Sequence, residues 1–327
     1  MSITIKDIAK QAGVSYSTVS KALRNSPLVK DPTKKKVLAI AEQLGYIPNI
    51  AARSLVQKKS YTIGVVWPSL QRVAPSALIT NINELLEKET YTTLLSINSI
   101  ESAVATFNRF QVDAIIVFGE TNGQNKGNTI QSKVPILYYG IKDQIKHPTI
   151  DVNRRFAIKF AVDHLNQLGH KKIAFIGEVT SKDLLQKEKY YGYLEGMASN
   201  YLTVKPQHVS DTKGLDVYSG YLSAKSLFTD APDVTAIISG SYDLTRGIIR
   251  AAQEKNLNIP NNLSIISYDN VPQQSNPDNA FTKIGVPIER IAEEITRTLL
   301  AIIDKKEVAD SIVLTPELNE GNSCKKI

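Results

Sequence analysis

The stretch TIKDIAKQAGVSYSTVSKAL, residues 4–23, decides the fold of the N-terminal part of the chain. Thr4, followed three residues later by Asp7, forms a capping-box pattern that starts a helix. Apolar residues recur at helical spacing on both sides of Gly13, which supplies a turn: Ile5, Ile8, Ala9 and Ala12 before it, and Val19, Ala22 and Leu23 after it. Two short helices joined by a tight turn are the arrangement of a helix-turn-helix.

A third helix follows, for which we expect Asp31 as N-cap, Pro32 at the first helical position and an end at Gly45. In a helix-turn-helix the first helix braces the second, whose start can enter the major groove of DNA. The side chains exposed there can reach base edges or phosphates: Ser15, Tyr16, Ser17, Thr18 and Lys21. The alternative is that they are only the solvated face of a small helical bundle.

The charge of the chain is concentrated in the same region. The 327 residues carry a formal charge of +7. Residues 1–60 hold eleven Lys and Arg but three Asp and Glu, a charge of +8, whereas the rest holds 28 and 29, which leaves −1. A basic module joined to a nearly neutral body is typical of polyanion binding.

The segment NIAARSLVQKKS, residues 49–60, predicts a hinge helix of about two turns, too short to be stable alone in water. Asn49 is its expected N-cap. Leu55 offers an apolar wedge that can enter a base step from the minor groove and bend DNA. The alternative is an ordinary interdomain linker.

Together, TIKDIAKQAGVSYSTVSKALRNSPLV (4–29) and VLAIAEQLGYIPNIAARSL (37–55) resemble the DNA-binding headpiece and hinge helix of the LacI/GalR family of bacterial transcription regulators. The resemblance implies that Tyr16, Ser17 and Lys21 of the second helix contact bases in the major groove. It also implies that Leu55 inserts into the minor groove. With the exposed positions named above, the candidate DNA-binding residues are Thr4, Ser15, Tyr16, Ser17, Thr18, Lys21, Asn49, Ala52, Arg53 and Leu55.

From residue 61 onward, short apolar runs alternate with amphipathic helices. We expect strands at 62–67, 92–97, 114–118, 135–139, 172–177, 235–239 and 263–267. We expect helices near 77–89, 102–110, 155–168, 188–199, 217–228, 244–255 and 287–304. Near-continuous Val/Ile runs alternating with helices predict parallel sheets covered on both faces. The fold class is therefore an all-α helix-turn-helix headpiece followed by an α/β core of two Rossmann-like lobes, with a cleft between them.

The family resemblance continues in HLNQLGHKKIAFIG (164–177) and IPNNLSIISYDN (259–270), and it implies the fold of periplasmic sugar-binding proteins. In that fold the chain crosses between the lobes three times, here near 153–156, 282–286 and 309–311. The expected divisions are a headpiece (1–46), a hinge helix and linker (47–60), a two-lobed core (61–321) and a tail (322–327). Within the core we expect an N-lobe at about 61–153 and 285–309 and a C-lobe at about 154–282 and 310–321.

Four positions are candidates for effector binding. By position in the family, Asp269 accepts hydrogen bonds from ligand hydroxyls, whereas an exposed aspartate capping a turn is the alternative. Ser69 and Arg72 lie in the first strand–helix loop, although Arg72 also fits a surface residue. Lys189 stands where the family usually carries an arginine, and it lacks the flat two-pronged fork of that side chain. Two cations at one cleft favour an anionic effector such as a sugar phosphate or a sugar acid.

The sequence offers little support for catalysis. Its four histidines are scattered, without metal-ligand spacing, and the glycines near 119–127 lack the Gly-Lys-Ser/Thr of a phosphate loop. We therefore expect no enzyme activity, no cofactor and no metal. No run approaches the ~18 apolar residues of a membrane span, and the single Cys324, in a polar tail, fits a reducing cytoplasm.

These observations favour a sequence-specific transcriptional regulator, a repressor, controlled by a sugar or sugar derivative bound between the lobes. We expect a homodimer bound to a near-palindromic operator, because two headpieces bring two half-sites. The residues after Leu318 contain no leucine heptads for a tetramer. Two rivals are a solute-binding protein, which would need a signal peptide and no basic headpiece, and an architectural DNA binder, which would not need the cleft.

Overall fold

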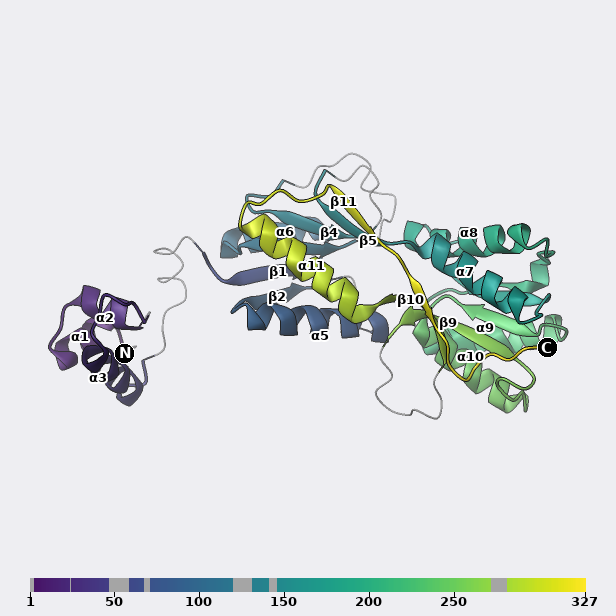
Figure 1. Cartoon of the computed structure of the whole chain (residues 1–327), viewed down its shortest axis with the longest axis horizontal. Helices are drawn as coiled ribbons and strands as arrows, with labels where there is room; N and C mark the ends of the chain where they lie inside the picture. The colour runs from purple at the N-terminus through teal and green to yellow at the C-terminus, as the bar shows by residue number, and fades with distance from the viewer. Residues whose placement is uncertain are drawn as a thin grey trace. The chain divides into compact units, whose positions relative to one another are not determined.

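The computed structural model describes residues 3–23, 25–46, 59–67, 71–119, 131–140, 146–271 and 281–327. The chain divides into two compact units, Met1–Ser60 and Tyr61–Ile327 (Figure 1). The described part of the first unit holds the helices α1 (Ile5–Ala12), α2 (Tyr16–Leu23) and α3 (Asp31–Gln43).

Local capping and a small apolar core define the first unit. One carboxylate oxygen of Asp7 accepts hydrogen bonds from the backbone N–H of Thr4 (2.8 Å) and from its hydroxyl (2.7 Å), as the capping-box pattern predicts. Gly13 ends α1 with φ at +69°, a backbone conformation that favours glycine. The N-cap of α3 is Lys30 and not Asp31, because the helix begins one residue earlier than expected. The helices enclose Ile8, Ala12, Val19, Ala22, Val29, Val37 and Ala41.

The first lobe of the second unit is built on a parallel sheet with the strand order β11-β5-β4-β3-β1-β2. Its strands are β1 (Thr62–Val66), β2 (Thr92–Ser96), β3 (Ala114–Phe118), β4 (Ile136–Tyr139), β5 (Thr149–Val152) and β11 (Ser311–Leu314). Alternate residues of β1 and β3 pack on opposite faces. One face is covered by α5 (Val73–Lys88) and α11 (Ile288–Ile303), and the other by α6 (Ile100–Phe110).

The second lobe repeats this plan with the strand order β12-β10-β9-β8-β6-β7, in which β12 alone pairs antiparallel. Its strands are β6 (Ile173–Gly177), β7 (Val209–Asp211), β8 (Ala236–Ser239), β9 (Ser264–Asn270), β10 (Thr282–Pro287) and β12 (Glu317–Asn319). The helices α7 (Arg154–Gln167) and α8 (Leu184–Ser199) cover one face. The other is covered by α9 (Val217–Asp230) and α10 (Tyr242–Glu254), and the short 3₁₀ helix η1 (Pro206–His208) precedes β7.

The predicted fold class is confirmed, but two of the expected lobe boundaries are displaced. The strand β10 belongs to the second sheet, so the chain returns to the first lobe at α11 and not at about residue 285. The C-lobe does not resume at residue 310 either, because β11 pairs with β5 in the first sheet. The last crossing therefore follows Leu314, whose carbonyl accepts a hydrogen bond from the backbone N–H of Asn153 (3.1 Å).

Residues 322–327 do not form a free polar tail. The buried hydroxyl of Ser323 donates to the Ile265 carbonyl (2.6 Å) and accepts from the backbone N–H of Thr282 (2.9 Å). Cys324 packs against the core of the second lobe, and burial raises the pKa of its thiol. The backbone N–H of Ile327 donates to the carbonyl of Leu168 (2.9 Å). These contacts join the end of the chain to the second sheet.

The substitution Ser323→Ala tests this attachment. It leaves the buried N–H of Thr282 without its acceptor, so we expect the free energy of unfolding to fall by about 1–3 kcal/mol, measured by urea denaturation. Lys326→Ala, at an exposed position beside it, is the matched control and should change stability little. Equal stability of the two variants would contradict a structural role for these residues.

Candidate functional site

The start of α2 presents the polar face that the sequence predicts. Tyr16, Ser17 and Lys21 are exposed, and Tyr16 keeps 56 % of its surface. Ser17 and Lys21 lie four residues apart and so share one side of the helix. Ser15 accepts a hydrogen bond from the backbone N–H of Thr18 (3.1 Å) through its side-chain oxygen, which caps α2. Three different polar side chains are therefore exposed in the first two turns of α2, and the N-terminus of this helix is capped.

Of the other predicted positions, the structure describes Thr4 but not the hinge residues or Ser69. Thr4 is exposed and caps α1. The hinge positions Asn49, Ala52, Arg53 and Leu55 lie outside the described residues, as does Ser69 of the first strand–helix loop.

A cavity of about 400 Å³ lies between the two lobes of the second unit. It is lined by residues at or just beyond the carboxyl ends of strands from both sheets: Trp67, Phe118, Tyr139, Val152, Glu178, Tyr268, Asp269 and Val286. Ligands of open α/β sheets bind outside the carboxyl ends of the strands. The volume falls in the range of small-molecule sites.

Aromatic rings form the first-lobe wall of this cavity. The ring centroids of Trp67 and Phe118 lie 4.1 Å apart at 61°, and those of Phe118 and Tyr139 lie 5.3 Å apart. Burial raises the pKa of Tyr139 to about 12, and it also raises the pKa of Tyr268 on the opposite lobe. Both hydroxyls stay neutral near pH 7, so the wall combines apolar faces with neutral hydrogen-bonding groups.

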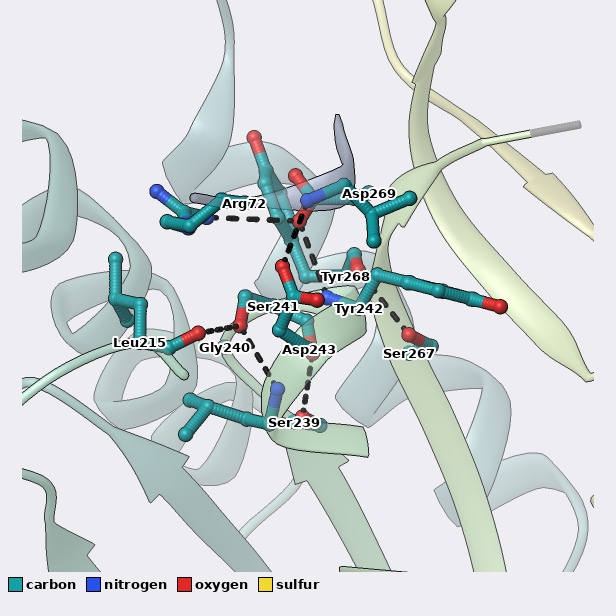
Figure 2. Close-up of polar contacts among 12 residues, drawn as sticks. Arg72, Leu215, Ser239, Gly240, Ser241, Tyr242, Asp243, Ser267, Tyr268 and Asp269 are labelled. Atoms are coloured by element: carbon teal, nitrogen blue, oxygen red, sulfur yellow. Dashed lines mark hydrogen bonds and ion pairs between the residues drawn. The ribbon is translucent and has the colours of Figure 1, made fainter. Parts of the chain in front are cut away.

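Two polar contacts join the lobes at the cavity. The guanidinium of Arg72, just before α5, lies 3.7 Å from a carboxylate oxygen of Asp269 in β9, and the same oxygen accepts from the backbone N–H of Tyr242 (3.1 Å). Figure 2 shows this pair beside the first turn of α10. Asp243 accepts from the backbone N–H of Val73 (3.0 Å), and burial raises the pKa of its carboxyl. Both carboxylates accept a hydrogen bond from the first residue of a helix, where the helix dipole favours negative charge.

Arg154, a buried cation in the cavity lining, was not among the predicted site residues. It begins α7 directly after β5, is 6 % exposed and forms an ion pair with Asp151. It also donates to the carbonyl of Val152 (3.2 Å). This pairing holds the guanidinium in the cavity lining with its charge largely balanced.

Lys189 on α8 is more deeply buried, at 3 % exposure, than the other predicted effector-binding residues that the structure describes, Arg72 and Asp269. Its ammonium nitrogen donates to the carbonyl of Gly240 (2.7 Å) and lies 4.0 Å from the centre of the Tyr268 ring. Burial is the main cause that lowers the pKa of Lys189 to about 7, opposed by Asp269 and assisted by Arg72. The structure therefore brings Arg72, Lys189 and Asp269 into one cavity.

Sequence reasoning missed Arg154 and Asp243. The position of Arg154 at the start of the expected C-lobe, within the expected crossing at 153–156, was an available signal. Asp243 gave no signal, since its partner Val73 is 170 positions away in the chain. Among the described residues, no group of three or more His, Cys, Asp or Glu side chains could hold a metal ion. No helix of the described ranges is long and apolar enough to cross a membrane.

A basic helix-turn-helix unit joined to a two-lobed α/β unit with a ligand-sized cavity defines a class of ligand-responsive DNA-binding proteins. Residues 4–49 match the bacterial regulatory proteins of the lacI family, and residues 162–324 match the periplasmic binding protein-like domain. The chain is 31 % identical to catabolite control protein A of Priestia megaterium over all of both chains. The protein belongs to the LacI family of bacterial transcriptional regulators.

Two further comparisons agree with this assignment. The chain is 28 % identical to the probable HTH-type transcriptional repressor ExuR of Bacillus subtilis (strain 168), over 99 % of both chains. Its fold matches that of the Lac repressor dimer bound to operator and the anti-inducer ONPF, with a TM-score of 0.83 and 23 % identity over 99 % of this chain and 100 % of that one.

The burial of Lys189 makes the stability of the protein depend on pH in a defined direction. Its pKa is about 7 in the folded protein, against about 10.4 for a lysine in an unfolded chain. Between those values the unfolded chain binds more protons, so the free energy of unfolding rises with pH. Lys189→Met lacks this contribution. The unfolding free energy of the variant minus that of the wild type should therefore be larger at pH 6 than at pH 9.

Urea denaturation at both pH values measures this difference. Lys182→Met, at an exposed position near the same helix, is the matched control and should show no such change. If Lys189→Met differs from the wild type by the same amount at pH 6 and at pH 9, Lys189 does not titrate in this range.

Proposed function

We propose that the protein is a transcriptional repressor that binds near-palindromic operator DNA as a homodimer and that a carbohydrate-like effector in the cleft controls this binding. The observation that carries the proposal is the exposed polar face of α2 on a unit whose formal charge is +8. Positive charge supplies affinity for phosphates, and side chains at the start of the helix supply sequence preference.

Each predicted DNA-contact position has a proposed role. Tyr16, Ser17 and Lys21 read base edges in the major groove, since they are exposed in the first two turns of α2. Thr4, Ser15 and Thr18 lie close to helix N-termini and position the headpiece on the phosphates. The hinge residues Asn49, Ala52, Arg53 and Leu55 are proposed to act in the minor groove.

A homodimer follows from the need for two half-sites. One protein of similar fold is the Lac repressor, whose structure is a dimer bound to operator, and this supports the same arrangement here. We place the protein in the cytoplasm, where its DNA target lies, and we assign it regulation without catalysis. The domain divisions are proposed as a headpiece, a hinge segment and a two-lobed effector core.

The effector that we propose is an anionic carbohydrate, such as a sugar acid or a sugar phosphate. The aromatic wall suits the apolar faces of a sugar ring, and Asp269 can accept hydrogen bonds from its hydroxyls. Arg72 lies at the cavity, and its buried Nε has no hydrogen-bond partner among the described residues. A guanidinium with a free donor suits a carboxylate or a phosphate.

Binding of DNA tests the first part of this proposal. Footprinting on genomic fragments should reveal a protected near-palindrome, with affinity that falls steeply as salt rises. In Lys21→Ala, preference for that operator over random DNA should fall by about tenfold or more, because a base contact is lost. Lys35→Ala, an exposed control on α3, should weaken both DNAs alike. Equal protection of random DNA and operator by the wild type would favour an architectural DNA binder.

Calorimetry with D-glucose, D-glucuronate and D-glucose 6-phosphate tests the class of effector. We expect tighter binding of the two anions. Arg72→Gln should weaken their binding by about tenfold or more, the usual effect of losing a charged hydrogen bond, with a smaller effect on D-glucose. Arg109→Gln, at an exposed position on α6, should leave all three affinities unchanged. Binding of the neutral sugar alone would exclude the anionic class.

A further inference from the structure

The buried ammonium of Lys189 has no carboxylate within ion-pair distance among the described residues. Its two close polar neighbours are the carbonyl oxygen of Gly240 at 2.7 Å and the face of the Tyr268 ring, whose centre is 4.0 Å away. These contacts satisfy part of the hydrogen-bonding capacity of an ammonium, but they do not neutralise its charge. Full burial of a charge without a counterion is costly.

The carboxylates nearest to Lys189 are engaged by other groups. Asp269 lies in the ion pair with Arg72 and accepts from the backbone N–H of Tyr242. Asp183, the N-cap of α8, accepts from the backbone N–H of Leu185 (2.9 Å) and from the side-chain amide of Gln186 (3.3 Å). Neither approaches Lys189 closely enough to form an ion pair.

Charged and titratable groups surround this lysine on every side of the cavity. Those of the second lobe are Glu178, Asp183, Tyr268 and Asp269, and those of the first lobe and the start of α7 are Arg72, Tyr139 and Arg154. Arg72 and Arg154 repel a proton on Lys189, whereas Asp269 and Asp183 attract it. The two tyrosine hydroxyls are neutral near pH 7, and burial raises the pKa of each further above that pH. Desolvation outweighs the attraction, and the pKa of Lys189 falls to about 7.

We propose that the anionic group of the effector enters the cleft together with a proton, which Lys189 accepts. The inference rests on the anionic effector of the proposed function. An anion in the cavity supplies the nearby negative charge that Lys189 lacks in the empty cleft. The ammonium form of Lys189 therefore becomes favoured once the ligand is bound. The protonation state of Lys189 then depends on whether the bound effector carries a negative charge.

This coupling makes recognition depend on pH. In the empty cleft, the protonated fraction of Lys189 falls about tenfold between pH 6 and pH 8, and the affinity for a permanently charged anion falls by about the same factor. An arginine at this position would stay protonated throughout this range, because a guanidinium does not titrate in proteins. Lys189→Arg should therefore bind the anion with little dependence on pH.

Nuclear magnetic resonance of the full-length protein with ¹³C-labelled lysine tests the proposal. The Cε signal of Lys189 is assigned by its loss in Lys189→Arg and followed from pH 5.5 to pH 11. Titrations are made without ligand and with sodium sulfate, D-glucuronate or D-glucose. Sulfate and glucuronate serve as anions because both stay fully ionised between pH 6 and pH 8.

We expect a midpoint near pH 7 in the free protein, and a midpoint above about pH 8 with at least one of the two anions but not with D-glucose. Glu195→Gln, at an exposed position on the same helix, is the control and should leave the midpoint of the free protein in place. A free midpoint near pH 10 overturns the proposal, and so does a midpoint that neither anion moves. Operator binding is measured separately, so failure here leaves the DNA-binding function intact, and the reverse also holds.

Discussion

Parallel strand pairing is the constraint on which the cleft depends. In a parallel sheet every strand ends at the same edge, and each of the two lobes presents that edge to the cavity. Trp67 follows β1, Tyr139 ends β4 and Asp269 lies near the end of β9. The same topology places the N-termini of α5 and α10 beside one another. The backbone N–H of Val73 can therefore donate to Asp243, and that of Tyr242 to Asp269. Functional groups that are distant in sequence therefore lie close together, because each of them follows or ends a strand at the same edge of its sheet.

Several charged side chains line the cavity, and burying a charged group costs free energy unless an opposite charge or hydrogen bonds balance it. Arg154 is paired with its near neighbour Asp151, which makes it a fixed part of the lining. The Arg72–Asp269 pair is different because its members belong to opposite lobes. A ligand that engages either member competes with one of the contacts that join the lobes. Binding and lobe geometry are therefore linked through the same charges, since a ligand shifts a conformational equilibrium by its differential affinity for the two states.

Much of this architecture could be predicted from the sequence. Buried central strands such as β3 are continuous apolar runs, and the long helix α11 is strongly periodic. The strands β5, β7, β10, β11 and β12 were missed; β7 and β12 are only three residues long, exposed residues interrupt β11 and β12, and β10 contains Gly285 and ends at Pro287. Arg72, Lys189 and Asp269 were found through resemblance and strand-end position. Their mutual geometry could not be predicted, because it depends on how the two lobes close, and the same holds for the contact of Asp243 with Val73.

The covalent connection of the two units supplies a route from the cleft to DNA. The strand β1 begins at Thr62, two residues beyond the end of the first unit at Ser60. A rotation of the first lobe against the second therefore moves the point from which the headpiece is attached. In the proposed homodimer, two such points set the separation of the two headpieces, and a near-palindromic operator accepts one separation. Because Arg72 and Val73 lie where α5 begins, contacts at the cleft act on the same rigid lobe that carries this attachment. Under the proposed function, a ligand that changes the position of the lobes can thus favour or oppose operator binding without any contact between effector and DNA.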